Sequence, residues 1–439
     1  MLKTNLWSLA FLGLFALRLA FGLWSPPVQP MQDELQTYLL GLKYYATGAW
    51  PYYGNDVILP PDNLLLQTQD PGPLSAFLVG LPLKLWPAPL SPFLFVNILS
   101  MGGFCLLGFY ARKRIPSLPA WFVYPWILTL PWTLHYSTEM MNFSFTVALA
   151  CLFFVALLES LPNLSLGWIP PPWANALMGF TLSAWVQLHR TWVLILPLLL
   201  LSFYRRWRVS RNFQAPLYFL LGSLPLGVLV LPTFLRPDYH LFRDVHGFSL
   251  TFNTHNLLSF FTTLVQFFAM ACFEMPRFIG QHTGERFHFL AQHWLLGPGA
   301  FLWFFGFLQV LLLVVFLFYP HSVAGDWKAV RGLTGGMFLF TYLCFLFTVK
   351  NPDINTFYEI LPLVLLDSLY VCNFFWSRPW GRTVLAFALL CSLIFEPSLA
   401  LIRRTENNSF YLRYEGTMSQ AIAQKNDHLL GERRPGFLY

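Results

Sequence analysis

Long apolar runs, separated by polar or proline-rich breaks, dominate the pattern of this chain. A bilayer core about 30 Å thick is crossed by roughly 20 helical residues, and runs near that length recur along the whole sequence. They predict about eleven transmembrane helices, near residues 6–24, 92–110, 118–134, 141–159, 173–189, 191–204, 215–232, 297–319, 332–349, 358–376 and 383–401. The shortest run, 191–204, would merge with its neighbour if Arg190 were only a buried polar residue. That merger would reverse the orientation of every later helix.

Two segments between the apolar runs, 25–91 and 233–296, are too long to be turns. Within the first, residues 35–46 have apolar positions at helical spacing, which is typical of a helix that lies on the membrane surface with its apolar face down. The apolar stretch 74–86 is too short to cross a membrane and predicts a second surface helix. A comparable stretch at 256–273 lies in the second long segment, and its length is nearly sufficient to span.

The composition is that of an integral membrane protein. Of the 439 residues, 56% are hydrophobic and 11% are charged, against roughly 25% charged residues in soluble domains. The net charge of +7 would also suit a nucleic-acid partner, but the Lys and Arg residues occur in short clusters between apolar runs rather than along one face. The six cysteines occur singly, without metal spacing, and we expect them in helix contacts. We therefore expect a multi-pass protein that does not bind nucleic acid.

The basic clusters define the expected orientation, because cytoplasmic loops of membrane proteins are enriched in Lys and Arg. The predicted topology places all of them on one side, at 111–114, 204–211, 328–331 and 378–382. The acidic residues of the first long segment then lie on the opposite, outer side. The chain is expected to comprise an N-terminal transmembrane module over 1–232, a long outer loop with a juxtamembrane helix over 233–296, C-terminal transmembrane helices over 297–402, and a polar tail over 403–439.

An acidic pair, Asp33 and Glu34, follows the first apolar run by a few residues. One interpretation is structural: Asp33 caps the surface helix and Glu34 lies in its first turn, where acids stabilise orphan amides and the helix dipole. The other interpretation is a carboxylate base at the mouth of a cavity on the outer side. The two are compatible, because a cap would also hold the carboxylate in place.

Several stretches resemble one family of membrane enzymes. An apolar first helix with an arginine, "LFALRLAFGLW", followed by "DELQTYLLGLKYYATGAWP", is similar to the start of the polytopic GT-C glycosyltransferases. The resemblance is to the branch that contains protein O-mannosyltransferases and the bacterial aminoarabinose transferase of lipid A. The stretches "QDPGPLSAFLVGLPLKLW", "LPWTLHYSTEMMN" and "LHRTWVLILPLLLLSFYRR" resemble later elements of that branch in the same order, over roughly the first 210 residues. The chain departs from it at residues 70–73, where Asp-Pro-Gly-Pro replaces the Lys-Pro-Pro of the branch.

The resemblance implies an all-α, polytopic helical bundle of GT-C type, with surface helices in the first outer loop. It also implies that a sugar moves, with inversion, from a polyprenyl-phosphate donor to a lipid, glycan or protein acceptor. The reaction would take place at the outer face of a bacterial cytoplasmic membrane, toward the periplasm. Since a lipid phosphate leaves as a stable anion, such a site needs one base and a few cations, rather than the two carboxylates of a glycosidase.

The family motif assigns the base to Asp33, while Glu34 orients or caps. The candidates for the donor phosphate are cationic side chains at outer helix ends: Lys350, Arg190 and His189. Lys350 and Arg190 could instead be cations that extend to the membrane interface, and His189 could be a helix histidine whose hydrogen bonds are made within the protein.

Three further residues are candidates for acceptor or auxiliary roles: Glu139, Asp70 and Tyr358. Glu139 could also be a neighbour of a helix N-cap, because Ser137 and Thr138 precede it. We expect no metal or other cofactor, although Glu139 together with Asp33 could hold a divalent ion.

Arg18 and Asp367 lie deep within apolar runs, where charges are costly unless they are paired. For Arg18 we expect an internal ion pair that fixes the first helix. For Asp367 we expect a contact with a neighbouring helix. Glu359 lies near the outer end of its run, beside Tyr358.

Two other functions fit a membrane bundle with intramembrane charge. A transporter or flippase often has an inverted repeat and paired broken helices at the midplane, and neither is evident in this sequence. A GT-C scaffold without activity is the second alternative, since the Lys-Pro-Pro motif is replaced. A shared cavity for Asp33, Glu139 and the candidate cations would favour the enzyme.

Overall fold

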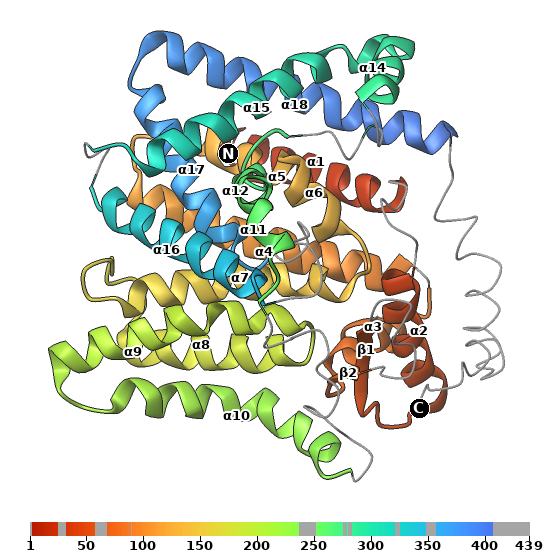
Figure 1. The fold of residues 1–439 in the computed structure, drawn as a ribbon. Helices are drawn as coiled ribbons and strands as arrows, with labels where there is room; N and C mark the ends of the chain where they lie inside the picture. The colour runs from red at the N-terminus through yellow and green to blue at the C-terminus, as the bar shows by residue number, and fades with distance from the viewer. Residues whose placement is uncertain are drawn as a thin grey trace.

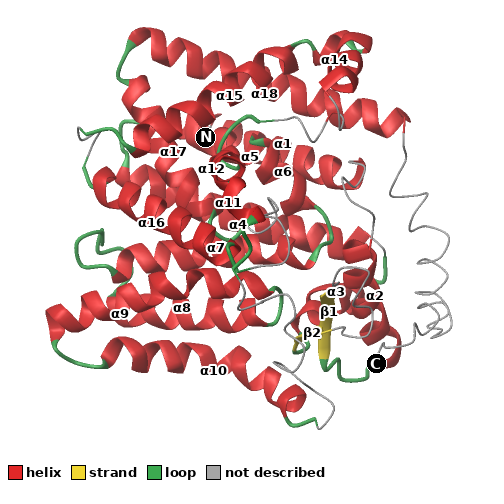
Figure 2. Cartoon of the chain, in the orientation of Figure 1, coloured by secondary structure: helices red, strands yellow, loops and turns green. Residues whose placement is uncertain are grey.

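The computed structural model describes residues 2–24, 32–57, 68–88, 90–236, 252–274, 279, 283–320, 325–347 and 357–406. Figures 1 and 2 show a bundle of helices that lie side by side with roughly parallel axes. Among the described residues, helices cover most of each apolar run, and the run at 118–134 is divided between two helices. The helices that contain these runs are α1 (Leu2–Trp24), α4 (Leu90–Arg114), α5 (Ala120–Thr129), α6 (Pro131–Thr138), α7 (Asn142–Ser160), α8 (Pro171–Val186), α9 (Leu196–Ser210), α10 (Gln214–Phe234), α15 (Pro298–Leu317), α16 (Trp327–Phe345), α17 (Leu361–Trp376) and α18 (Pro379–Glu406).

Within the described residues, 6 helices are long and apolar enough to cross a membrane by length and composition: α1, α4, α7, α10, α15 and α18. The chain is therefore a multi-pass membrane protein. Helix α7 is at the centre of the bundle, since 83% of its apolar stretch is buried inside the protein. The corresponding share for the peripheral helix α10 is 11%. Helix α7 packs against α4, α6, α8 and α9, and a helix that is apolar on all sides is expected in such a position.

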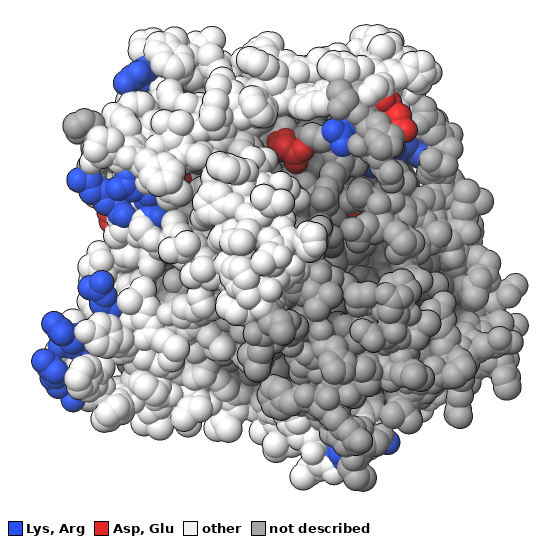
Figure 3. Space-filling view, in the orientation of Figure 1, with Lys and Arg blue, Asp and Glu red and all other residues white. Residues whose placement is uncertain are grey.

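The basic clusters lie together at one end of the bundle, which we call the basic end. Figure 3 shows most of the visible Lys and Arg side chains along one edge, over the ends of α9, α16 and α17 in Figure 1. Residues that are distant in sequence meet there: Ser117 Oγ lies 2.5 Å from Asn373 Oδ1. The basic clusters of the bundle thus lie on one side, as predicted.

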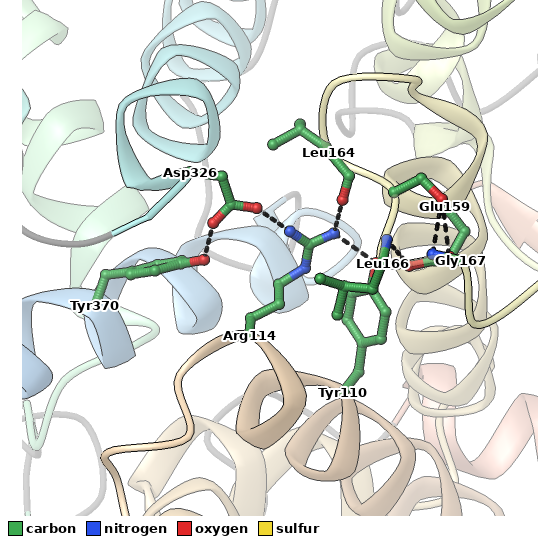
Figure 4. A network of polar contacts seen from close by, with 9 residues as sticks. Tyr110, Arg114, Glu159, Leu164, Leu166, Gly167, Asp326 and Tyr370 are labelled. Carbon is green, nitrogen blue, oxygen red and sulfur yellow. Dashed lines mark hydrogen bonds and ion pairs between the residues drawn. The ribbon is translucent and has the colours of Figure 1, made fainter.

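Figure 4 shows a network at the basic end, centred on Arg114. The guanidinium of Arg114 donates to Asp326 Oδ2, to the Leu164 carbonyl and to the Tyr110 hydroxyl, the last at 2.6 Å. Asp326 also accepts from the Tyr370 hydroxyl. The network joins α4, the loop after α7, the N-terminus of α16 and α17, so it ties together the elements that the basic clusters flank.

A small sheet lies at the opposite end, which we call the hairpin end. Strands β1 (Tyr53–Val57) and β2 (Thr68–Pro71) pair antiparallel, with Tyr53 opposite Pro71 and Val57 opposite Thr68. The sequence analysis predicted helices alone for this region. The reason for the omission is physical: the strands are 5 and 4 residues long, and the β1 sequence "YGNDV" has no sustained alternation of apolar and polar residues.

The two predicted surface helices are α2 (Gln32–Thr47) and α3 (Leu74–Leu85), and they pack against each other. The packing is close because Gly41 and Gly80 face one another's helices, and an added Cβ at Gly41 would collide with Val79. Tyr38 and Leu42 on α2 have 0% exposure. The apolar face of α2 is therefore covered by protein rather than turned toward lipid.

The second long segment contains α11 (His255–Leu258), α12 (Phe260–Ala269), α14 (Thr283–Gln292) and the 3₁₀ turn η3 (Trp294–Leu296). The stretch 256–273, for which we predicted a surface helix, is interrupted at Ser259 and ends inside the bundle. The amide of Phe273 donates to Gln309 Oε1 at 2.9 Å, and Ser368 donates to the Ala271 carbonyl at 3.3 Å. Backbone at such depth must be satisfied by neighbouring helices, and α15 and α17 provide those partners.

Arg18 of α1 is completely buried, but its partners differ from the expected ion pair. Its guanidinium donates to the Thr133 carbonyl at 2.9 Å, to Ser100 Oγ at 2.9 Å and to Ser137 Oγ at 2.6 Å. Within the described residues, these neutral oxygen atoms take the place of an acidic partner. Arg18 thereby joins α1 to α4 and α6, which is the fixing role that the sequence predicted. For Asp367 the prediction is confirmed, because Trp327 Nε1 of α16 donates to its carboxylate at 2.9 Å.

Candidate functional site

The break after α8 positions two of the candidate cations. Helix α8 ends at Val186, and the Trp185 carbonyl accepts from the amides of Leu188 and His189 at 2.9 and 3.0 Å. His189 is extended, with φ −161° and ψ 138°, and the 3₁₀ turn η2 (Arg190–Ile195) leads into α9. The chain therefore turns at this point, so the run at 191–204 does not merge with its neighbour.

Arg190 pairs with an acid from the hairpin. Its Nε lies 3.6 Å from Asp70 Oδ1, and the Asp70 side chain is 3% exposed while that of Arg190 is 31% exposed. Glycines allow the approach: Gly72 has φ +98°, and an added Cβ there would collide with Gln187. The Asp-Pro-Gly-Pro sequence thus places a carboxylate against Arg190.

His189 pairs with a second buried acid, Glu359, in the turn before α17. His189 Nδ1 lies 3.2 Å from Glu359 Oε1, and Trp185 Nε1 donates to the same oxygen at 2.9 Å. The Thr191 hydroxyl donates to this oxygen too, and lies 2.5 Å from His189 Nδ1.

Tyr358 connects this region to α6. Its hydroxyl donates to the Trp132 carbonyl, and its ring centroid lies 6.0 Å from that of Phe143, which lies 6.1 Å from the ring of His189. We call the group formed by Asp70, His189, Arg190, Thr191 and Glu359 the His189–Arg190 cluster. Its members come from β2, from η2 and the residue before it, and from the turn before α17.

Glu139 has a different partner. It lies between α6 and α7, is 3% exposed, and its Oε1 lies 3.1 Å from Nδ1 of His135, one turn earlier. Since α6 ends at Thr138 and α7 begins at Asn142, Glu139 follows one helix and does not belong to the first turn of the next. The structure thus brings Asp70, His189 and Arg190 together with Tyr358 nearby, and gives Glu139 a histidine of its own.

The other candidates are described in part or not at all. The backbone of Asp33 and Glu34 lies in the first turn of α2, which begins at Gln32, so Asp33 is inside the helix rather than at its cap. A difference of one or two residues at a helix end is usual. The side chains of these two acids, and all of Lys350, lie outside the described residues. Within the described part of the chain, no group of three or more His, Cys, Asp and Glu side chains could hold a metal ion.

The His189–Arg190 cluster has the chemistry of an anion site. Two side chains that can carry positive charge are partly exposed, at 31% for Arg190 and 24% for His189, and each is held from behind by a nearly buried carboxylate. Such backing orients a cation. The sequence alone assigned no role to Glu359 or Thr191. A signal for Glu359 existed, because "HRTW" and "YE" both flank apolar runs on the predicted outer side and so place opposite charges at the same depth.

Two solved structures resemble this chain. The crystal structure of ArnT from Cupriavidus metallidurans bound to undecaprenyl phosphate aligns with a TM-score of 0.55 at 12% sequence identity, over 91% of this chain and 76% of the other. The crystal structure of the same protein in the apo state aligns with a TM-score of 0.47 at 14% identity, over 98% and 77%. No protein-family model and no curated protein sequence matches the chain.

Proposed function

The chain has the polytopic GT-C fold, and from that premise we propose that it is a membrane glycosyltransferase that moves a sugar from a polyprenyl-phosphate donor to an acceptor. The observation that carries the proposal is the His189–Arg190 cluster, in which two partly exposed side chains that can carry positive charge are held by buried acids at the hairpin end. A protein with the same fold has been crystallised with undecaprenyl phosphate, so this architecture is compatible with a lipid phosphate.

In the proposed reaction, Asp33 removes a proton from the acceptor hydroxyl or amine. The acceptor atom then attacks the anomeric carbon from the face opposite the phosphate, and the bond from that carbon to the phosphate oxygen breaks with inversion. The electron pair leaves on the lipid phosphate, whose added charge Arg190 and His189 stabilise. Asp70 and Glu359 act as positioning residues, because they hold the two cations.

The location of α2 supports this assignment of the base. Helix α2, which contains Asp33 in its first turn, packs against β1, and β1 pairs with the strand that carries Asp70. Both parts of the proposed site therefore belong to the hairpin end. Glu34 would orient or cap, Lys350 would be a further phosphate ligand, and Glu139 and Tyr358 would contribute on the acceptor side. We propose that this end faces the periplasm of a bacterial inner membrane and that the reaction uses no metal.

The first experiment tests the base. Purified protein in liposomes receives a radiolabelled polyprenyl-phosphate sugar and an acceptor extract, and release of free lipid phosphate is measured. We expect Asp33→Asn to abolish turnover, while the matched control Glu285→Gln, which removes an exposed acid on α14, retains it. Undiminished turnover in Asp33→Asn would remove this residue from the mechanism.

A second variant tests the phosphate site. Arg190→Gln should lower turnover by about 10²-fold, the usual cost of removing one donor from a developing negative charge. Arg378→Gln, an exposed arginine at the basic end, is the control for loss of charge. Transport of the intact donor across the liposome without release of lipid phosphate would instead favour a flippase, and donor binding without turnover would favour a scaffold.

A further inference from the structure

A hollow of about 540 Å³ lies at the basic end, between the loop after α7 and the last turns of α9. We call it the arginine hollow, and its lining consists of Pro162, Asn163, Tyr204, Arg205, Arg208 and Val209. Its volume is within the range of roughly 300–1,000 Å³ usual for ligand sites. The proposed glycosyl transfer does not use it, because the His189–Arg190 cluster lies beyond the other end of α9.

The charge of the arginine hollow is positive. Arg205 and Arg208 are exposed, and the lining contains no acid. The carboxylate of Glu159 is not part of the lining and binds other groups: it accepts from the Tyr110 hydroxyl at 2.5 Å and from the amides of Leu166 and Trp168 at 2.9 and 2.8 Å. A site of this kind selects an anion, and arginine matches the geometry of a phosphate group.

On the face of α9 that leads to the hollow, apolar, aromatic and cationic side chains follow one another in the same order as the parts of a phospholipid. Leu200, Tyr204 and Arg208 are spaced four residues apart, so they lie one above another on one side of the helix. Leu200 is 64% exposed and Tyr204 is 51% exposed. Tyr204 also accepts a hydrogen bond from Arg208 Nη1 at 3.3 Å. The exposed surface thus changes from apolar to aromatic to cationic toward the helix end, as a lipid changes from acyl chain to glycerol to phosphate.

We propose that the arginine hollow binds the headgroup phosphate of an anionic phospholipid from the leaflet at the basic end. Arg205 and Arg208 contact the phosphate, Tyr204 lies at the level of the glycerol, and Leu200 packs along an acyl chain. The stripe on α9 selects a lipid over a soluble phosphate, because a soluble anion gains nothing from Leu200. Basic pockets between helices at this membrane surface are suited to such headgroups.

The test is a lipid titration. Full-length protein in neutral detergent is freed of lipid, and binding of phosphatidylglycerol, phosphatidylcholine and glycerol 3-phosphate is followed by native mass spectrometry. We expect phosphatidylglycerol to bind in preference to the other two. The double variant R205Q/R208Q should bind it roughly 30-fold more weakly, since each cation near the membrane surface contributes about fivefold. The control K328Q/R378Q removes two other exposed cations at the basic end and should stay within about threefold of wild type.

Three outcomes would overturn the proposal. The first is equal affinity of R205Q/R208Q and the control for phosphatidylglycerol. The second is equal binding of phosphatidylcholine, and the third is displacement of the lipid by glycerol 3-phosphate, which would indicate a soluble-anion site. Thermal unfolding without lipid checks that the variant is folded, and if the double variant is not, the single variant R208Q must show a loss of roughly fivefold.

Discussion

Replacing Asp326 with Asn should destabilise the protein, because the substitution leaves Arg114 without its carboxylate. The side chain of Arg114 is 0% exposed and that of Asp326 is 26% exposed. Removing one partner of a fully buried pair costs about 3–5 kcal/mol, and the partial exposure of Asp326 reduces this to about 2–3 kcal/mol. The hydrogen bonds of Arg114 to Tyr110 and to the Leu164 carbonyl remain, so the helix ends should stay in place.

The assay is equilibrium unfolding in mixed micelles, with Lys328→Gln as the control. Lys328 is an exposed cation two residues along the chain, and its loss should change the free energy of unfolding by less than about 0.5 kcal/mol. A double variant, Arg114→Met with Asp326→Leu, should recover part of the lost stability, because it removes both charges from the buried site. If Asp326→Asn is as stable as the control, the Arg114–Asp326 pair between α4 and α16 does not contribute to the free energy of unfolding, and the reasoning is refuted.

Two further substitutions test other parts of the bundle. Arg18→Met should lower the free energy of unfolding by about 1–3 kcal/mol, since buried carbonyls lose their donor; unchanged thermal stability in detergent would contradict this. Gly222→Val should destabilise by at least about 1–3 kcal/mol, because a Cβ at Gly222 would collide with Ala176 of α8, whereas Gly227→Val on the same helix meets open space and should not.

The sequence predicted the bundle because two of its signals are local. Apolar run length gives the helices, and the basic clusters give their common end. The hairpin of β1 and β2 was not predictable in this way, because short strands depend on pairing rather than on periodicity. The burial of Phe273 was missed for a similar reason: an apolar stretch has the same composition whether it faces lipid or other helices, and only partners such as Gln309 decide between the two.

The sequence identified His189, Arg190 and Asp70 as candidate site residues, but it did not identify Glu359 or predict which acid pairs with which cation. His189 and Arg190 follow directly from their position at a helix end. Glu359 is 170 residues from His189, and no spacing rule relates them. Asp70 could be placed against Arg190 only through the hairpin, which the sequence did not reveal. The sequence does indicate at which depth in the membrane these charged residues lie. Acids and cations predicted at the same depth on one side of a membrane are candidates for ion pairs.

The hydrogen bonds of Arg18 have a consequence for biogenesis. The proline at 131 interrupts the helix after Thr129, and Arg18 supplies donors for carbonyls on both sides of that interruption, at Leu128 and Thr133. The ribosome releases α1 before α4, α5 and α6, so this guanidinium enters the membrane before its acceptors exist, at a cost of at most about 2.5–3.5 kcal/mol, the value for an arginine at a helix centre. Ser100 on α4 is the next partner to be synthesised, and the partners on α5 and α6 follow. Helix α1 is therefore in the membrane before the helices that bind Arg18, and these helices pack against it in the order of their synthesis.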